Sequence, residues 1–144
     1  MKTASAVIDL LGGGRVLGSR VSTDKELVIS LRQGLPFRAL VALKRRLRLS
    51  DSELAQAIDI HPRTLARRKS QKRLRSDESD RLSRLARVTS HAIDVLGSQE
   101  NAIAWLRNPN RALGGVPPLQ YLSTDLGARR VEAALSHIEW GDLS

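Results

Sequence analysis

The sequence predicts an all-α protein, in which a helix-turn-helix region is followed by a small helical module. Three observations support this class: apolar residues recur at helical spacing, helix-capping patterns precede them, and no stretch alternates as a strand would. The chain has 144 residues and a hydrophobic content of 41%, which suits one domain or two small ones. Leu, Ala, Ile and Val must build the core, because aromatic residues make up only 3%.

The N-terminal third is expected to begin with a loose segment. Residues 1–22 contain three consecutive glycines at 12–14 and no periodic apolar face, so we predict a flexible segment there. Thr23 and Glu26 then form a capping box, which predicts a helix ending at Gly34. Its inward side is expected to contain Leu27, Val28 and Leu31. A second helix follows, with apolar residues at helical spacing at Phe37, Leu40, Val41 and Leu47.

Two short helices joined by a tight turn are predicted next. Ser50 and Glu53 form a second capping box, and Leu54 begins an apolar side. Pro62 disfavours helical geometry in the residue before it and suits the first position of a new helix. We therefore expect helices over 51–58 and 62–70.

These two helices meet the packing demands of a helix-turn-helix. Ala55 is small where the helices must cross, and Ile60 and Leu65 supply the apolar contacts that fix their angle. Asp59 stands in the turn at a position that often has positive φ, which Asp tolerates at about 1 kcal/mol. In this motif the second helix enters the DNA major groove.

Four helical segments complete the predicted fold. A long helix capped by Ser76 ends at Gly97, and a shorter one begins at Ser98 and stops near Pro109. Residues 111–123 read as a turn with one or two helical turns. The last helix is capped by Thr124, and its inward residues are expected to be Leu126, Val131, Leu135 and Ile138. We therefore divide the chain into an N-terminal segment (1–22), a DNA-binding region (23–75), a connecting helix (76–97) and a C-terminal module (98–144).

The positive charge is confined to the middle of the chain. The net charge is +9, and residues 37–75, with 12 basic and 3 acidic side chains, carry all of that excess. Basic runs on helices are usually solvated surface, but charge confined to one segment favours an anionic partner. Together with the packing pattern, this favours DNA.

Helical geometry sorts the basic residues into two roles. With Leu65 pointing to the core, Arg63 and Arg67 point away from it and are the candidates for base contacts. Thr64 and Gln71 lie on the flank of that face. Four further side chains are expected to reach phosphates: Arg68, Lys69, Lys72 and Arg73.

The sequence gives little support for a metalloprotein, an enzyme or a membrane protein. The sequence has no cysteine and three scattered histidines without metal-ligand spacing, so neither a metal site nor a cofactor is expected. No nucleophile and base are arranged for catalysis, and we predict that the protein is not an enzyme. No segment is long and apolar enough to cross a membrane, so a cytoplasmic location is expected.

Most of the chain resembles a known family, and the second half carries the most specific motifs. The resemblance extends from Leu35 to Gly141, and its most specific part is an ordered series of short motifs: Trp105-Leu106, Pro109-Asn110, Ala112-Leu113-Gly114-Gly115, Pro118-Leu119 and Gly127. This series resembles the Xre/MbcA/ParS-type antitoxins. In that family an N-terminal helix-turn-helix region binds the promoter of its own operon, and a C-terminal module binds a toxin, typically a RES-domain protein acting on NAD⁺.

The resemblance implies a neutralising antitoxin that covers the toxin's active-site entrance and represses its own operon, at least as a homodimer. We expect the tail Glu139–Ser144 to approach the toxin pocket and Trp105 to lie in the core. Predicted toxin contacts are Leu119, Tyr121, Arg129, Trp140, Asp142 and Leu143. Two alternatives stay open: a free-standing transcription regulator whose C-terminal module binds a ligand or itself, and a pure inhibitor whose helix-turn-helix serves only dimerisation.

Overall fold

The computed structural model describes residues 4–141, which fold into helices and turns. Their bounds are α1 Ala4–Leu10, α2 Gly14–Leu17, α3 Asp24–Gln33, α4 Phe37–Leu47, α5 Asp51–Ala57, α6 Pro62–Gln71, α7 Ser76–Leu96, α8 Gln99–Arg107 and α9 Asp125–Glu139, with 3-10 helices η1 Arg111–Leu113 and η2 Pro118–Tyr121. Pairing of β type within 4–141 is limited to two isolated bridges, Pro36 with Arg73 and Asn110 with Val116. The all-α prediction is confirmed. No helix in this part of the chain is both long and apolar enough to cross a membrane.

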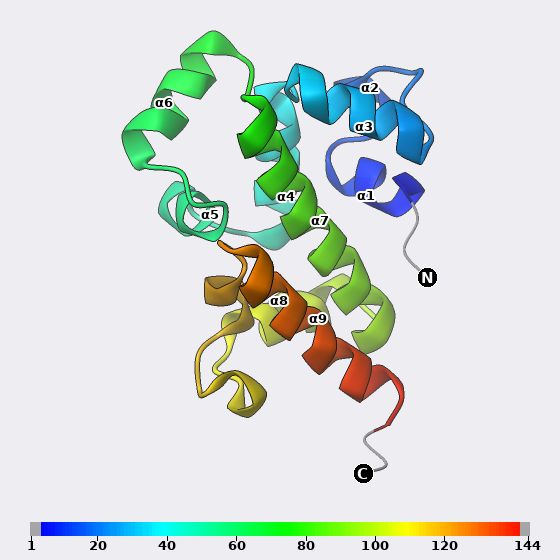
Figure 1. Ribbon diagram of the computed structural model, residues 1–144, viewed down its shortest axis with the longest axis vertical. Coiled ribbons are helices and arrows are strands. Elements are labelled where there is room, and N and C mark those ends of the chain that lie inside the picture. Colours follow the sequence, from blue (N-terminus) through cyan, green and yellow to red (C-terminus); the bar gives the residue numbers. More distant parts are fainter. Residues whose placement is uncertain (1–3, 142–144) are drawn as a thin grey trace.

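The long helix α7 organises the molecule. It runs through the middle, with α6 towards one end of the long axis and the end of α9 at the other (Figure 1). Helices α1 and α3 pack on α7 in its first part, and α8 and α9 pack on it further along. The buried side chains form one cluster that continues from Val7 through Leu82 to Leu135. The two ends of the molecule therefore share a single core.

The prediction of a loose N-terminal segment is wrong. Val7, Ile8 and Leu10 of α1 are buried, and Leu11 is fully buried behind them. Helix α1 contacts α7, α3 and α4. It has only two turns, which is too short for a helical period to stand out beside the glycines that follow.

Most helix starts agree with the sequence. Thr23 and Ser50 begin complete capping boxes, and Ser98 and Thr124 accept backbone hydrogen bonds as N-caps. Ser76 is the exception, because it is the first residue of α7 and the N-cap is Arg75. There the carboxylate of Glu78 accepts the backbone N–H of Arg75, which replaces a serine cap.

Three residues predicted to face the core lie at the surface instead. Val28 is 44% exposed, Leu126 64% and Ile138 44%. The remaining inward predictions for α9 are confirmed, since Val131 and Leu135 are fully buried. Trp105 is partly buried and packs against the core, as expected.

Candidate nucleic-acid and protein-binding surfaces

Helices α5 and α6 have the geometry of a helix-turn-helix. The turn contains Asp59 with φ of +54°, and the N–H of Ile60 donates to the carbonyl of Ala55 over 2.8 Å. Ala55 is 2% exposed and Leu65 6%. The predicted crossing and turn are therefore present.

The start of α6 is held by His61 and Pro62. His61 is the N-cap, and its Nδ1 accepts the backbone N–H of Arg63 over 3.1 Å. Pro62 occupies the first turn, where a missing N–H costs nothing. This cap fixes the direction in which the first residues of α6 project.

The outer face of α6 presents the two arginines predicted to contact bases. Arg63 and Arg67 are exposed, on the side of α6 away from Leu65. Of the two residues predicted on its flank, Thr64 is half-buried and Gln71 is exposed. Lys69 and Lys72 are exposed, as a role at a DNA backbone requires. Beside α6 lies a hollow of about 680 Å³ with an apolar lining from α4 and α6 and with Lys44, Arg45 and Lys69 among its lining residues.

Arg68 does not fit the phosphate contact predicted for it. It is 4% exposed, and its Nε donates to Glu78 Oε1 over 2.7 Å while Nη1 donates to Gln71 Oε1 over 3.1 Å. Burial disfavours the charge on Glu78. The hydrogen bonds from Arg68 and from the Arg75 backbone, with the attraction of Arg68, outweigh it and lower the pKa of Glu78. The pair ties α6 to the start of α7.

Arg73 is likewise engaged with the protein. Its Nη1 donates to the carbonyl oxygen of Gly34 over 2.6 Å, next to the bond from the N–H of Leu74 to Leu35 O. The backbones of Gly34 and Leu74 lie so close that a Cβ on Gly34 would overlap the Leu74 carbonyl oxygen. Arg73 therefore joins the end of α6 to the turn before α4, but the residue is exposed, so its phosphate contact stays a prediction.

The C-terminal module is built around close packing of η2 against α9. A Cβ on Gly127 would overlap the carbonyl oxygen of Tyr121, so only glycine allows this approach. Between η1 and η2, the chain turns through Gly114 and Gly115, which have φ of +72° and +84°. Asn110 closes this turn by pairing with Val116.

The residues predicted to contact a toxin do not gather at one point. Leu119 is half-buried and lines a hollow of about 150 Å³ that also involves Glu53 and Arg107. Tyr121 lines a different hollow, of about 540 Å³, beside α9. Arg129 is exposed on α9 and pairs with Asp125 over 3.0 Å.

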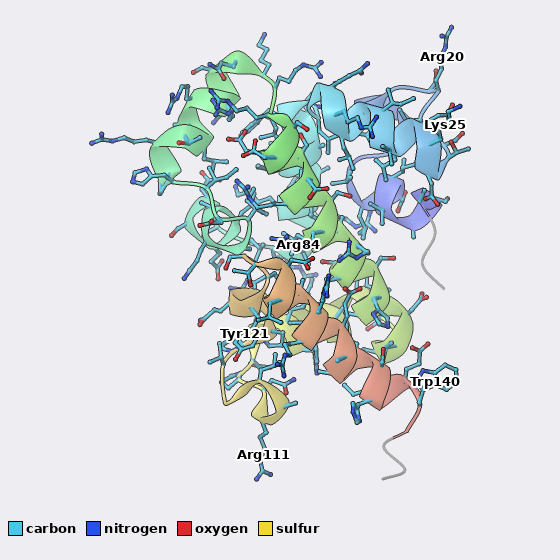
Figure 2. The ribbon with its side chains drawn as sticks, viewed as in Figure 1. Arg20, Lys25, Arg84, Arg111, Tyr121 and Trp140 are labelled. Atoms are coloured by element: carbon cyan, nitrogen blue, oxygen red, sulfur yellow. The ribbon has the colours of Figure 1, made fainter. Side chains whose placement is uncertain are left out.

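Trp140 is the most exposed large apolar side chain described, at 76%, and it extends outward at the end of α9 (Figure 2). Asp142 and Leu143 lie outside the described residues.

The sequence analysis did not identify Leu126 as a surface residue, although at 100° per residue it lies opposite Leu135. Ile138 gave no such signal, because it shares the face of Val131 and is exposed where the core ends.

Residues 4–141 contain no cluster of three or more metal-ligating side chains.

Two arginine hydrogen bonds connect the C-terminal module to helices outside it. Arg107 of α8 donates to Glu53 of α5 over 2.7 Å, and Arg84 of α7 donates to the carbonyl of Leu122 over 3.1 Å. Both bonds join the C-terminal module to the rest of the fold.

Comparisons with known proteins match both halves of the chain. Residues 26–87 match the antitoxin Xre-like helix-turn-helix domain, and residues 91–141 match the antitoxin Xre/MbcA/ParS C-terminal toxin-binding domain. Antitoxin Xre of Photorhabdus laumondii is 32% identical over 90% of this chain and 89% of its own length. Antitoxin Xre of Pseudomonas putida is 35% identical over 84% of this chain and 76% of its own.

A solved structure is also similar. A chain of the MbcT–MbcA toxin–antitoxin complex of M. tuberculosis matches with a TM-score of 0.52 and 28% identity, over 70% of this chain and 90% of that one.

Proposed function

Since this chain belongs to the Xre family of antitoxins, whose C-terminal domain binds toxins, we propose that it neutralises a RES-domain toxin acting on NAD⁺. As an antitoxin it is not an enzyme and acts by binding. In this proposal residues 98–144 hold the toxin, residues 23–75 bind operator DNA, and residues 76–97 connect them. The observation that carries the proposal is the match of both halves, in order, to the two domains of such antitoxins.

Neutralisation works by covering the entrance of the toxin's active site with the C-terminal tail. Trp140 supports this role, because a large exposed aromatic side chain at an accessible end can anchor an interface. The rest of α9 positions it: Glu139 Oε1 lies 3.6 Å from Nε2 of His91 on α7. Trp140 therefore directly follows a helix that is held against α7.

Truncation tests this mechanism. Deleting residues 140–144 keeps Glu139 beside His91, so α9 should remain folded while neutralisation is lost. The measurement is growth of cells that express the gene adjacent to this one together with either form of the antitoxin. Full growth rescue by the truncated protein would show that neutralisation does not require the tail.

Operator binding uses the outer face of α6. Arg63 and Arg67 read bases, and Lys69 and Lys72 contact phosphates, which makes affinity fall steeply with salt. Each arginine–guanine contact contributes about 1–3 kcal/mol of discrimination. The complex acts in the cytoplasm, where its promoter lies.

Binding of promoter DNA and of a scrambled duplex, measured by fluorescence anisotropy, tests this face. Arg63→Ala with Arg67→Ala should abolish the preference for the promoter, whereas Lys72→Ala should weaken binding to both duplexes. Arg20→Ala is a matched control, because Arg20 lies at the N-terminal corner, away from α6 (Figure 2). Unchanged discrimination in the double variant would rule out the assigned reading face.

A symmetric operator is usually bound by a protein dimer with the same two-fold symmetry. We propose a homodimer that places two α6 helices about 34–36 Å apart, one turn of DNA. Sedimentation of the free protein at two concentrations measures its mass directly. A monomer that stays monomeric on its promoter contradicts this part of the proposal.

A further inference from the structure

One side of α9 carries a groove that the mechanism above does not use. Two hollows, of about 540 and 350 Å³, adjoin there and share Ala112 of η1. We call them together the α9 groove. Its lining includes Ala112, Tyr121, Leu126, Arg130, His137 and Ile138.

The groove is apolar where an ordinary surface helix would be polar. At 100° per residue, the α9 side chains that line it fall within an arc of 120°, from Leu126 to Ile138. These two residues are 64% and 44% exposed. They lie at the two edges of the arc, with Arg130 and His137 between them. Exposed apolar side chains combined with polar groups on one side of a helix suit a protein partner.

The groove is also preformed. Its wall of η1 and η2 is held by the close approach of Gly127 to the Tyr121 carbonyl and by the pairing of Asn110 with Val116. A rigid surface loses little conformational entropy when a partner binds.

The rim of the groove is cationic. Arg130 lines the larger hollow, and the exposed side chain of Arg111 extends from the η1 turn beside it (Figure 2). Within residues 4–141 neither arginine forms an ion pair. A partner with carboxylates would therefore complement this rim.

We propose that the α9 groove is the surface that selects the cognate toxin, by holding an apolar ridge of the toxin that carries at least one carboxylate for Arg130 or Arg111. The groove lies wholly within the residues matched to a toxin-binding domain, and its lining ends at Ile138, directly before the tail Glu139–Ser144 in the sequence. It lies towards the other end of the molecule from α6 (Figure 1). This inference rests on the proposed function, but it assigns recognition to the groove and occlusion to the tail.

Two substitutions in the α9 groove test the assignment, with one matched control. Leu126→Asp places a charge on the apolar side, and Arg130→Glu reverses the rim. Val28→Asp makes the same kind of change at an exposed apolar residue, 44% exposed, on α3. All three residues are at the surface, so thermal unfolding followed by circular dichroism should show each variant folded.

The measurement is the Kd for the purified protein encoded by the gene adjacent to this one, by biolayer interferometry. Both groove variants should bind at least tenfold more weakly, and Val28→Asp should stay within threefold of the wild type. The antitoxin lacking residues 140–144 should still bind the toxin while failing to inhibit its NAD⁺ consumption.

Groove variants that bind as tightly as the wild type overturn the inference and leave the proposed function standing. If they instead convert an antitoxin dimer to monomers with toxin affinity unchanged, the groove joins two copies and the inference is also wrong. A wild type that does not bind the toxin at all overturns the proposed function, and the inference with it.

Discussion

The buried pair of Arg68 and Glu78 gives the sharpest test of how α6 is held in place. Both side chains are 4% exposed, and the ion pair measures 2.7 Å. Glu78→Gln keeps the shape but removes the carboxylate that is hydrogen-bonded to the buried guanidinium, and leaves only the attraction of Asp77. Removing one partner of a buried pair costs about 3–5 kcal/mol, against a total of about 5–15 kcal/mol for a typical domain.

We therefore expect Glu78→Gln to lower the Tm by roughly 10 °C, at about 2–4 °C per kcal/mol. Urea unfolding followed by circular dichroism measures the free energy of unfolding itself. Glu100→Gln makes the same change on an exposed side chain of α8 and should cost less than about 0.5 kcal/mol.

Replacing both partners separates the charge from the shape. Arg68→Met with Glu78→Leu leaves no charge at the site. The Arg75 N–H loses its acceptor, which costs about 1–3 kcal/mol, and the exposed Gln71 amide, which loses its bond from Arg68, can bond water instead. The double variant should therefore be more stable than Glu78→Gln alone. A single variant within 1 kcal/mol of the wild type, or a double variant no more stable than the single, would refute the reasoning.

Three further predictions concern stability. Gly127→Ala should cost about 1–3 kcal/mol, measured by urea unfolding, because the new Cβ overlaps the carbonyl of Tyr121; a neutral effect would show that η2 can move. Arg48→Gly should raise the Tm, since Arg48 ends α4 with φ of +55°, which costs a residue with a Cβ about 1 kcal/mol; a lower Tm contradicts this. Acid should destabilise the fold: hydrogen bonds from the Ser50 backbone lower the pKa of Glu53, and those from Arg68 and Arg75 lower that of Glu78. Their contribution is present above the pKa of a free glutamate, roughly 4.3, and is lost as pH falls through the lower folded values. Unfolding free energies at pH 7 and pH 3 measure the loss, and equal values would contradict it.

Local signals allowed much of the fold to be predicted from the sequence. Capping boxes such as Ser50 with Glu53 act within one turn, so their geometry follows from spacing alone. The positive φ of Asp59 and the small Ala55 follow from the motif in the same way. The conformation of these residues is determined by their neighbours along the chain.

Long-range partners explain the failures. Arg68 looked like a residue at the margin of a basic face, but its carboxylate partner comes from the next helix and buries it. The phosphate contact of Arg73 stays a prediction, but its bond to the carbonyl of Gly34, 39 residues away, was equally invisible in the sequence. Helix α1 is held by α7, whose side chains lie far along the sequence.

The candidate toxin surface shows the same limit. The outward position of Leu126 follows from its angle to Leu135, but the groove beside it requires the η1 turn to fold back along α9, and Ala112 joins the two hollows only in three dimensions. Sequence spacing gives the residues on each side of the groove separately and does not bring them together.

Hydrogen exchange tests the central claim, that DNA and toxin bind opposite ends of one antitoxin. The exchange of the chain is measured alone, with its promoter duplex, and with the purified RES-domain toxin. We predict that DNA slows exchange in residues 50–72, and that toxin slows it in residues 110–141. Toxin protection confined to α5 and α6, or DNA protection along α9, would contradict the account.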